Sequence, residues 1–227
     1  MEQQKKISQY DYQNAIKPFE QFIREKDIRL RTDEYIILHF DGVGMTKKYL
    51  SRMASSDKKV FAECLLKTAQ TLCSHFKSTR IAYVYNDEIS LLLEGQDVVN
   101  NYHNRVQKLV SIASAKASIE LFKCLKINEH IALLKEMESS CLFAVKCYNL
   151  PQHLVNDYFK ARLLSCKKSI FDRKGNFEEK ESWEKFGYLI TYQSPAWKDE
   201  CIDFSRMKLT KKPQDEYYSL NRKTNFC

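Results

Sequence analysis

EYIILHF, residues 34 to 40, runs directly into DGVGM, residues 41 to 45. The first segment is a short apolar run rich in aromatic and β-branched residues, which predicts a buried strand. It ends abruptly at Asp41, and two of the chain's five glycines, Gly42 and Gly44, follow at once. Because glycine tolerates positive φ angles and lets a ligand approach the backbone closely, this stretch predicts a strand that ends in a ligand-binding turn.

The segments on either side of this strand predict a mixed α+β domain. Apolar residues at spacings of three and four predict helices, and short apolar runs bounded by polar turns predict strands. The expected helices are Tyr10 to Arg29 (interrupted near Pro18), Ser56 to Lys77, Arg105 to Phe122 and Leu154 to Leu164; the further strands are Arg80 to Tyr85, Ile89 to Leu93 and Leu142 to Tyr148.

The order of these elements predicts a ferredoxin-like fold. Strand, helix, strand, strand, helix, strand (βαββαβ) is the split βαβ arrangement. Right-handed crossovers would place the first and third strands side by side, with the helices on one face. We expect one domain over residues 1–227, with a core of about residues 30–170, extra terminal helices and an extension over 171–227 in which Trp183 to Ile190 packs on the body.

The composition excludes several classes of protein. A hydrophobic share of 44% and a charged share of 29% are those of a globular chain, not a disordered one. No apolar run approaches the roughly 20 residues that span a bilayer, and the first ten residues contain no signal-peptide core. We therefore expect a soluble cytoplasmic protein without a membrane partner. The eight cysteines and five histidines show no metal-binding spacing, so reduced thiols are expected and zinc is not.

The net charge of +8 suits a nucleic-acid or nucleotide partner, because phosphates attract clustered lysine and arginine side chains. Pairs of basic residues lie at Lys47-Lys48 and at Lys167-Lys168. A solvated surface explains such clusters about equally well when composition alone is considered.

Acidic residues follow two of the predicted strands. Asp41 ends the first strand, and Asp87 and Glu88 lie in the turn of the predicted hairpin. If the first and third strands are neighbours, Asp41 and Asp87 meet at one edge of the sheet. Paired carboxylates suit Mg²⁺, and two such ions can activate an attacking oxygen and stabilise a leaving pyrophosphate. Ordinary turn chemistry is the alternative for each segment taken singly.

Arg105, Lys108 and Ser111 follow one another at intervals of three residues, which places them on one face of a predicted helix. A basic stripe beside a carboxylate site would suit the phosphates of a nucleoside triphosphate. A solvated helix face is the alternative.

Taken together, these segments resemble the tRNA(His) guanylyltransferase-like superfamily, the 3′–5′ nucleic-acid polymerases. That family carries D-G-R-x-F after its first strand, where this chain has Asp41 to Met45. It carries S-D-E-Y-S-F at the hairpin, where this chain has Asn86 to Leu91. Its R-x-x-K-x-x-S helix is matched by Arg105, Lys108 and Ser111.

The resemblance continues in the same order toward the C-terminus. A C-Y-P segment and a D-Y-x-x-W-R-Q helix of the family are similar to Cys147-Tyr148 and to Asp157 through Arg162. A later K-F-G is matched by Lys185-Phe186-Gly187, so that the resemblance extends from about Phe19 to Trp197.

The resemblance implies a polymerase-palm fold and the addition of nucleotides to the 5′ end of a tRNA. It implies two Mg²⁺ ions on Asp41, the Gly42 carbonyl and Asp87, with Glu88 as a supporting carboxylate. GTP or ATP would be the nucleotide substrate, and a homo-tetramer would be the assembly. The expected nucleotide contacts are Gly42, Val43, Gly44, Met45, Thr46, Arg105, Lys108 and Ser111; the expected nucleic-acid contacts are Lys47, Lys48, Arg162, Lys167 and Lys168.

The chain departs from the family pattern at identifiable positions. Val43 replaces the arginine that follows D-G, and Met45 replaces the aromatic residue. The segment from Lys167 to Arg173 (KKSIFDR) stands where the family has H-I-N-N-L-Y-N. Lys167 can contact phosphate but cannot act as a neutral imidazole.

These departures leave three functions open. The first is a Mg²⁺-dependent transferase acting on tRNA(His) or repairing 5′-truncated tRNA. The second is a palm-domain synthase that makes a cyclic or oligonucleotide signal from triphosphates alone. The third is a non-catalytic nucleotide- or RNA-binding module, against which the retained Asp41 and Asp87 argue, because facing carboxylates are costly without a cation.

Overall fold

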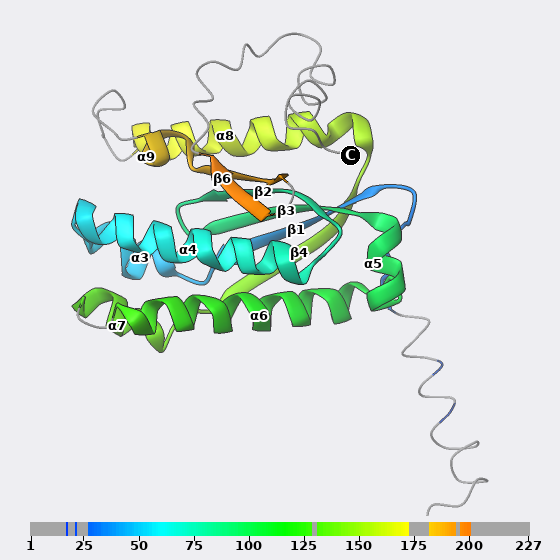
Figure 1. The fold of residues 1–227 in the computed structure, drawn as a ribbon, viewed down its shortest axis with the longest axis horizontal. Coiled ribbons are helices and arrows are strands. Elements are labelled where there is room, and N and C mark those ends of the chain that lie inside the picture. The colour runs from blue at the N-terminus through cyan, green and yellow to red at the C-terminus, as the bar shows by residue number, and fades with distance from the viewer. Residues whose placement is uncertain are drawn as a thin grey trace, which may run out of the picture.

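Six strands form one sheet in the order β4-β1-β3-β2-β5-β6 (Figure 1). Every neighbouring pair is antiparallel. The structure is a computed structural model that describes residues 17, 21, 27–128, 131–172, 182–193 and 196–200. The strands are β1 (Tyr35–Gly42), β2 (Thr79–Tyr85), β3 (Glu88–Glu94), β4 (Phe143–Leu150), β5 (Tyr188–Gln193) and β6 (Ala196–Glu200).

Helices cover the sheet on both faces and give a three-layered molecule (Figure 1). The long helices α4 (Ser55–His75) and α6 (Val106–Ile127) lie on one face, and α8 (Val155–Asp172) lies on the other. The shorter helices are α3 (Met45–Lys48), η2 (Leu50–Arg52), α5 (Gly95–Tyr102), α7 (Ala132–Glu138), η3 (Gln152–Leu154) and α9 (Ser182–Phe186).

The alternation of side chains along β1 divides the core in two. Ile36, Leu38 and Phe40 point into the larger apolar cluster, which contains the buried stripes of α4 and α6. Ile37 points the other way, into a smaller cluster with Val155 of α8. Because β1 is central and buried on both faces, its sequence reads as a continuous apolar run instead of an alternating one.

The predicted α+β class and ferredoxin-like core are confirmed: β1 lies between β3 and β4, and α4 and α6 share one face. The predicted strand is slightly too short, because β1 continues through Asp41 and Gly42. The chain beyond residue 170 differs more. It contributes α9 and two further strands, of which β5 pairs with β2, so Trp183 to Ile190 does pack on the body. Most of the predicted helix from Tyr10 to Arg29 lies outside the described residues.

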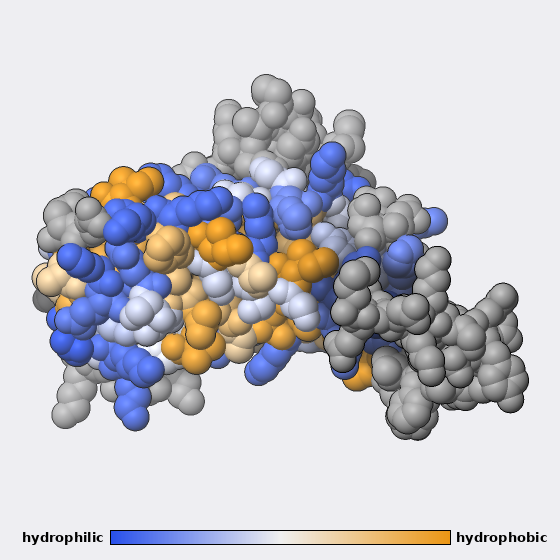
Figure 2. Space-filling model, turned by 90° about the horizontal axis from the view of Figure 1, so that it is seen from below, coloured by the Kyte–Doolittle hydropathy of each residue, from blue (hydrophilic) through white to orange (hydrophobic). Residues whose placement is uncertain are grey.

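The outer side of the α6 layer carries apolar side chains among charged ones (Figure 2). On α6, Ile119 and Phe122 are about half exposed. Lys116 and Lys123 both pair with Glu120 between them, so ion pairs interrupt the apolar positions. Within the described ranges, no helix combines the length and the apolar character needed to cross a membrane.

Candidate functional site

The pairing of β1 with β3 brings Asp41 and Asp87 to the same edge of the sheet. Asp41 lies opposite Glu88 in the register of these strands. The N–H of Gly42 donates to the carbonyl oxygen of Asp87 over 3.0 Å, which attaches the β2–β3 turn to the end of β1. Asn86 adopts a positive φ of 57°, as tight hairpin turns require.

Two glycines shape the turn that follows Asp41. A Cβ atom on Gly42 would lie 2.6 Å from Sδ of Met45 and 3.0 Å from Cβ of Asp87, so only glycine allows this approach. Gly44 has a φ of 70° and begins α3 in the left-handed conformation that glycine tolerates. The turn therefore carries the chain sharply from the strand into α3, beside Asp87.

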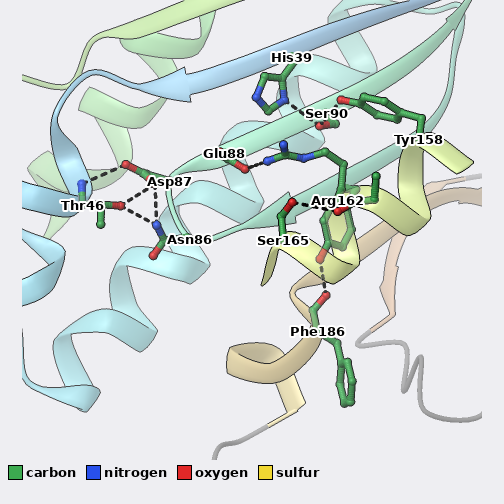
Figure 3. A network of polar contacts seen from close by, with 12 residues as sticks. His39, Thr46, Asn86, Asp87, Glu88, Ser90, Tyr158, Arg162, Ser165 and Phe186 are labelled. Carbon is green, nitrogen blue, oxygen red and sulfur yellow. Dashed lines mark hydrogen bonds and ion pairs between the residues drawn. The ribbon is translucent and has the colours of Figure 1, made fainter. Parts of the chain in front are cut away.

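The carboxylate of Asp87 is held by residues from two segments (Figure 3). The backbone N–H of Thr46 donates to Oδ2 over 3.0 Å, and the Thr46 hydroxyl donates to Oδ1 over 2.7 Å. The side-chain amide of Asn86 also donates to Oδ1, over 2.7 Å. These bonds fix the orientation of the carboxylate and leave further acceptor capacity on its oxygens.

Asp87 is 5% exposed, whereas Asp41 beside it is exposed. Burial raises the pKa of Asp87; the Thr46 hydrogen bonds oppose this rise, and the charge of Asp41 adds to it. The charged form of Asp87 is therefore disfavoured both by burial and by the neighbouring charge of Asp41. A cation between the two carboxylates would remove the repulsion.

Glu88 points away from Asp87, toward the α8 side of the sheet. It forms an ion pair with Arg162 of α8 (Figure 3). Both side chains are partly buried, and Arg162 neutralises much of the Glu88 charge. The expected supporting carboxylate and the expected nucleic-acid contact are therefore paired with each other.

A chain of polar groups lies beside this ion pair, between the sheet and α8. Nδ1 of His39 and the hydroxyl of Tyr158 each lie 3.0 Å from Oγ of Ser90 (Figure 3). Burial, together with the nearby charges of Arg162 and Lys146, lowers the pKa of His39 to about 4. His39 is therefore neutral at pH 7 and serves as a hydrogen-bonding link rather than a charge.

Arg105, the first residue of the predicted basic stripe, is not brought to the carboxylates. The start of α6 lies beside the segment that precedes β1, where Arg105 pairs with Asp27. The Ser111 hydroxyl donates to a carbonyl of its own helix. By contrast, the hydroxyl of Ser114, farther along α6, donates to the carbonyl oxygen of Phe143, which lies opposite Gly42 in β1. Arg105 precedes Ser114 by more than two helical turns, roughly 13 Å along the axis.

The turn after Asp41 offers less free backbone than the sequence suggests. The N–H of Val43 donates to the carbonyl oxygen of Leu142, and the side chain of Met45 is fully buried. Gly44 is exposed, and the side chain of Lys48 lies along it, with Nζ 3.9 Å from where a Cβ would stand. Lys47 is also exposed. This turn can therefore meet phosphate through Gly44 and the two lysines.

Lys167 and Lys168 lie within α8, but their side chains fall outside the described part of the chain. Two polar residues that the sequence left aside belong to the site. Asn86, which supports Asp87, could have been suspected from its place in the hairpin. Lys146 of β4, opposite His39 in the register, is signalled by the alternation of exposed residues along that strand.

The donor set at this edge suits a hard cation. Asp41, Asp87 and the Gly42 carbonyl supply oxygen atoms, which Mg²⁺ prefers. No cluster of three or more His, Cys, Asp or Glu side chains with metal-binding geometry occurs among the residues that the structure describes. A cation here would complete its shell with substrate oxygens, as Mg²⁺ commonly does with phosphates.

Comparisons with known proteins identify the family and the fold of this chain. The family model described as tRNAHis guanylyltransferase matches residues 13–151. A bacterial tRNA(His) guanylyltransferase-like protein solved in complex with GTP is 20% identical; the match covers 85% of this chain and 94% of that one, with a TM-score of 0.70. Another, solved in complex with ATP, is 18% identical, with coverages of 92% and 98% and a TM-score of 0.71.

The tRNA(His) guanylyltransferase of Saccharomyces cerevisiae is more distant. It is 15% identical, and the match covers 83% of this chain and 99% of that one, with a TM-score of 0.52. The curated protein sequences contain no significant match to this chain. At these identities the solved structures establish the shared fold, and the family model carries the assignment of family.

Proposed function

Because this chain belongs to the tRNAHis guanylyltransferase family, and is thus a nucleotidyltransferase, we propose that it adds a nucleotide to the 5′ end of a tRNA in a Mg²⁺-dependent reaction. The acceptor would be tRNA(His) or a 5′-truncated tRNA in need of repair, and GTP or ATP would supply the nucleotide. The resemblance alone supports a cytoplasmic location and a tetramer.

One observation carries this proposal. Asp41 and Asp87 lie at one sheet edge, and Asp87 is buried and held by Thr46 and Asn86. Burial and the repulsion of a second carboxylate both destabilise the charged form of Asp87, and a bound cation would offset both effects. Bound there, Mg²⁺ would neutralise phosphate charge and polarise the reacting phosphoryl group.

The chain's own residues supply positioning. Asp41, Asp87 and the Gly42 carbonyl would hold the metal, and the exposed turn at Gly44 with Lys47 and Lys48 would take the triphosphate. In phosphoryl transfer such positioning and charge neutralisation account for most of the rate enhancement. We do not assign Arg105 a contact with the triphosphate, since it pairs with Asp27 at the other end of α6.

A signal synthase and a non-catalytic binding module are the competing functions. The absence of H-I-N-N-L-Y-N at Lys167 to Arg173 permits the synthase. An RNA acceptor is required by the transferase and not by the synthase, which separates the two.

The test uses the purified full chain with Mg²⁺ and labelled GTP or ATP, with and without 5′-monophosphorylated and 5′-truncated tRNA. Asp87→Asn removes one carboxylate, and Asp57→Asn, in the first turn of α4, is the matched control. We expect label at the tRNA 5′ end with the wild type and Asp57→Asn, and none with Asp87→Asn.

Other outcomes overturn the proposal in recognisable ways. Release of pyrophosphate with a small nucleotide product, independent of RNA, would identify a synthase. RNA binding without product in any reaction would identify a binding module.

A further inference from the structure

Part of the sheet face on the α8 side is uncovered, directly beside Asp41. In β4 the side chains of Ala144, Lys146 and Tyr148 are exposed on one face, while Phe143 and Val145 pack on the other. Tyr148 lies at a ring-centroid distance of 6.3 Å from Tyr158 of α8, which places the exposed row on the α8 side.

This opening is local. On the same side of the sheet, Ile37, Leu92 and Ile81 are buried in the smaller apolar cluster with α8. Leu150, at the far end of β4, is buried in that cluster as well. Among the described residues of β4 on this side, Ala144, Lys146 and Tyr148 are thus left open, and β4 is the edge strand next to β1.

The open row is aligned with the carboxylate site. Ala144 lies opposite Asp41, Lys146 opposite His39, and Tyr148 opposite Ile37. Residues two apart on a strand are roughly 7 Å apart, so Lys146 and Tyr148 stand about one and two such steps from the Asp41 position. With increasing distance from Asp41, the row therefore presents the small side chain of Ala144, the ammonium of Lys146 and the ring of Tyr148. The step from the ammonium to the ring is similar to the distance between a nucleotide's phosphate and its base.

The chemistry of the row matches a nucleotide. No acidic side chain pairs with Lys146 in the described part of the chain, so its ammonium is available to a phosphate. Tyr148 is 37% exposed, and its ring packs edge-to-face against the ring of Tyr158, which holds it in place. Nucleobases of every kind stack on such rings.

We propose that this open row of β4 binds the 5′-terminal nucleotide of the RNA acceptor, with its phosphate at Lys146 and its base on Tyr148. The assignment rests on the proposed function. The turn at Gly44 and Lys48 lies on the other side of the carboxylates and is left to the triphosphate, so the two reactants approach Asp41 from different sides.

The test measures binding, without added triphosphate, by fluorescence anisotropy of a labelled RNA with a 5′-monophosphate or a 5′-hydroxyl. The variants are Lys146→Met, Tyr148→Ala and Tyr148→Phe. Lys67→Met is the control, since Lys67 is an exposed lysine of α4 on the opposite face. Thermal unfolding confirms that each variant is folded.

We expect Lys146→Met to weaken binding of the 5′-monophosphate RNA and to lower its salt slope by about one, with little effect on the 5′-hydroxyl RNA. Tyr148→Ala should lower the affinity for both RNAs by about tenfold, and Tyr148→Phe should bind both RNAs as the wild type does.

Equal affinities of Lys146→Met and Lys67→Met would overturn the inference. So would a loss of affinity for a fluorescent GTP analogue with RNA affinity unchanged, because the row would then serve the triphosphate. The transfer assay is separate: transfer without these binding effects refutes only this inference, and these effects without transfer refute only the proposed function.

Discussion

The Thr46 hydroxyl donates to Oδ1 of Asp87 over 2.7 Å, while the backbone N–H of the same residue donates to Oδ2 over 3.0 Å. One residue of α3 thus holds both oxygens of a carboxylate that lies in the β2–β3 turn. The contact makes the α3 segment, and not only the hairpin, responsible for the orientation of Asp87.

Thr46→Val should weaken the metal site while leaving the fold intact. The substitution keeps the backbone bond and the side-chain volume but removes a hydrogen bond to a charged acceptor, which is worth about 1.5 to 3 kcal/mol. We expect the Mg²⁺ or Mn²⁺ concentration for half-maximal thermal stabilisation to rise at least tenfold. Thr46→Ser retains the hydroxyl and should behave like the wild type; an equal loss in Thr46→Ser would contradict the assignment.

Asp87→Asn should stabilise the metal-free protein at neutral pH. The pKa of Asp87 is raised in the folded state, chiefly by burial, so the folded protein binds this proton more tightly than the unfolded chain does. The charged group therefore costs stability above the folded pKa, and the cost disappears below the unfolded pKa. Melting temperatures should be higher for Asp87→Asn at pH 7 and should converge with the wild type near pH 3.

Removing Arg162 should be costly because Glu88 would lose its partner beside Asp41. We expect Arg162→Met to lower the free energy of unfolding by about 1 to 3 kcal/mol in urea titrations, since the pair is partly buried and charge-assisted. Arg52→Met is the matched control: Arg52 pairs with Glu136 at 3.9 Å on the surface, where an ion pair contributes little. Similar losses of stability in both variants would show that the Glu88–Arg162 pair contributes no more to stability than a surface ion pair does.

His39 should make stability depend on pH in the acidic range. Burial lowers its pKa to about 4 in the folded protein, below the usual 6.5, so the unfolded chain binds this proton first. The stability due to neutral His39 is therefore full above about pH 6.5 and falls as the pH drops toward 4. His39→Gln should flatten the melting-temperature profile over that window. An unchanged profile would place the titrating group elsewhere.

The two thiols between α4 and α6 should differ in reactivity. The contact with Cys64 lowers the pKa of the Cys124 thiol, and the same contact together with burial raises the pKa of Cys64. Of the cysteines whose side chains the structure describes, iodoacetamide should therefore modify Cys124 first, at a lower pH than an ordinary thiol requires, while the fully buried Cys73 should resist. Peptide mapping measures this order, and Cys64→Ser should retain the reaction because its hydroxyl also donates.

The central elements could be predicted because their patterns are local. The apolar run that ends at Asp41 is short and rich in β-branched and aromatic residues, which predicts a buried strand. The turn around Asp87 is too short to allow anything but a hairpin between the two apolar runs that it joins. From these the ferredoxin-like order follows, and with it the meeting of Asp41 and Asp87. That part of the site rests on the pairing of β1 with β3 alone.

The remainder depends on three-dimensional placement that residue spacing does not encode. Arg105 and Lys108 share a helix face, but which end of α6 meets the carboxylates depends on the crossover, and their end lies beside Asp27. Glu88 follows Asp87 in sequence, but side chains of adjacent residues point to opposite faces of a sheet. The Glu88 side chain therefore lies on the α8 side, where it pairs with Arg162. Lys146 is exposed only because α8 leaves β4 partly open.

The position of β1 between β3 and β4 also determines the order in which the site can assemble. The hairpin that carries Asp87 pairs residues close in the chain, whereas Asp41 must join Glu88 and Ala144, which lie far along it. Closing such long loops is entropically expensive and slow, so the hairpin should precede the arrival of β1 in refolding. The late step brings two like charges together, and a divalent cation in the refolding buffer should therefore accelerate it.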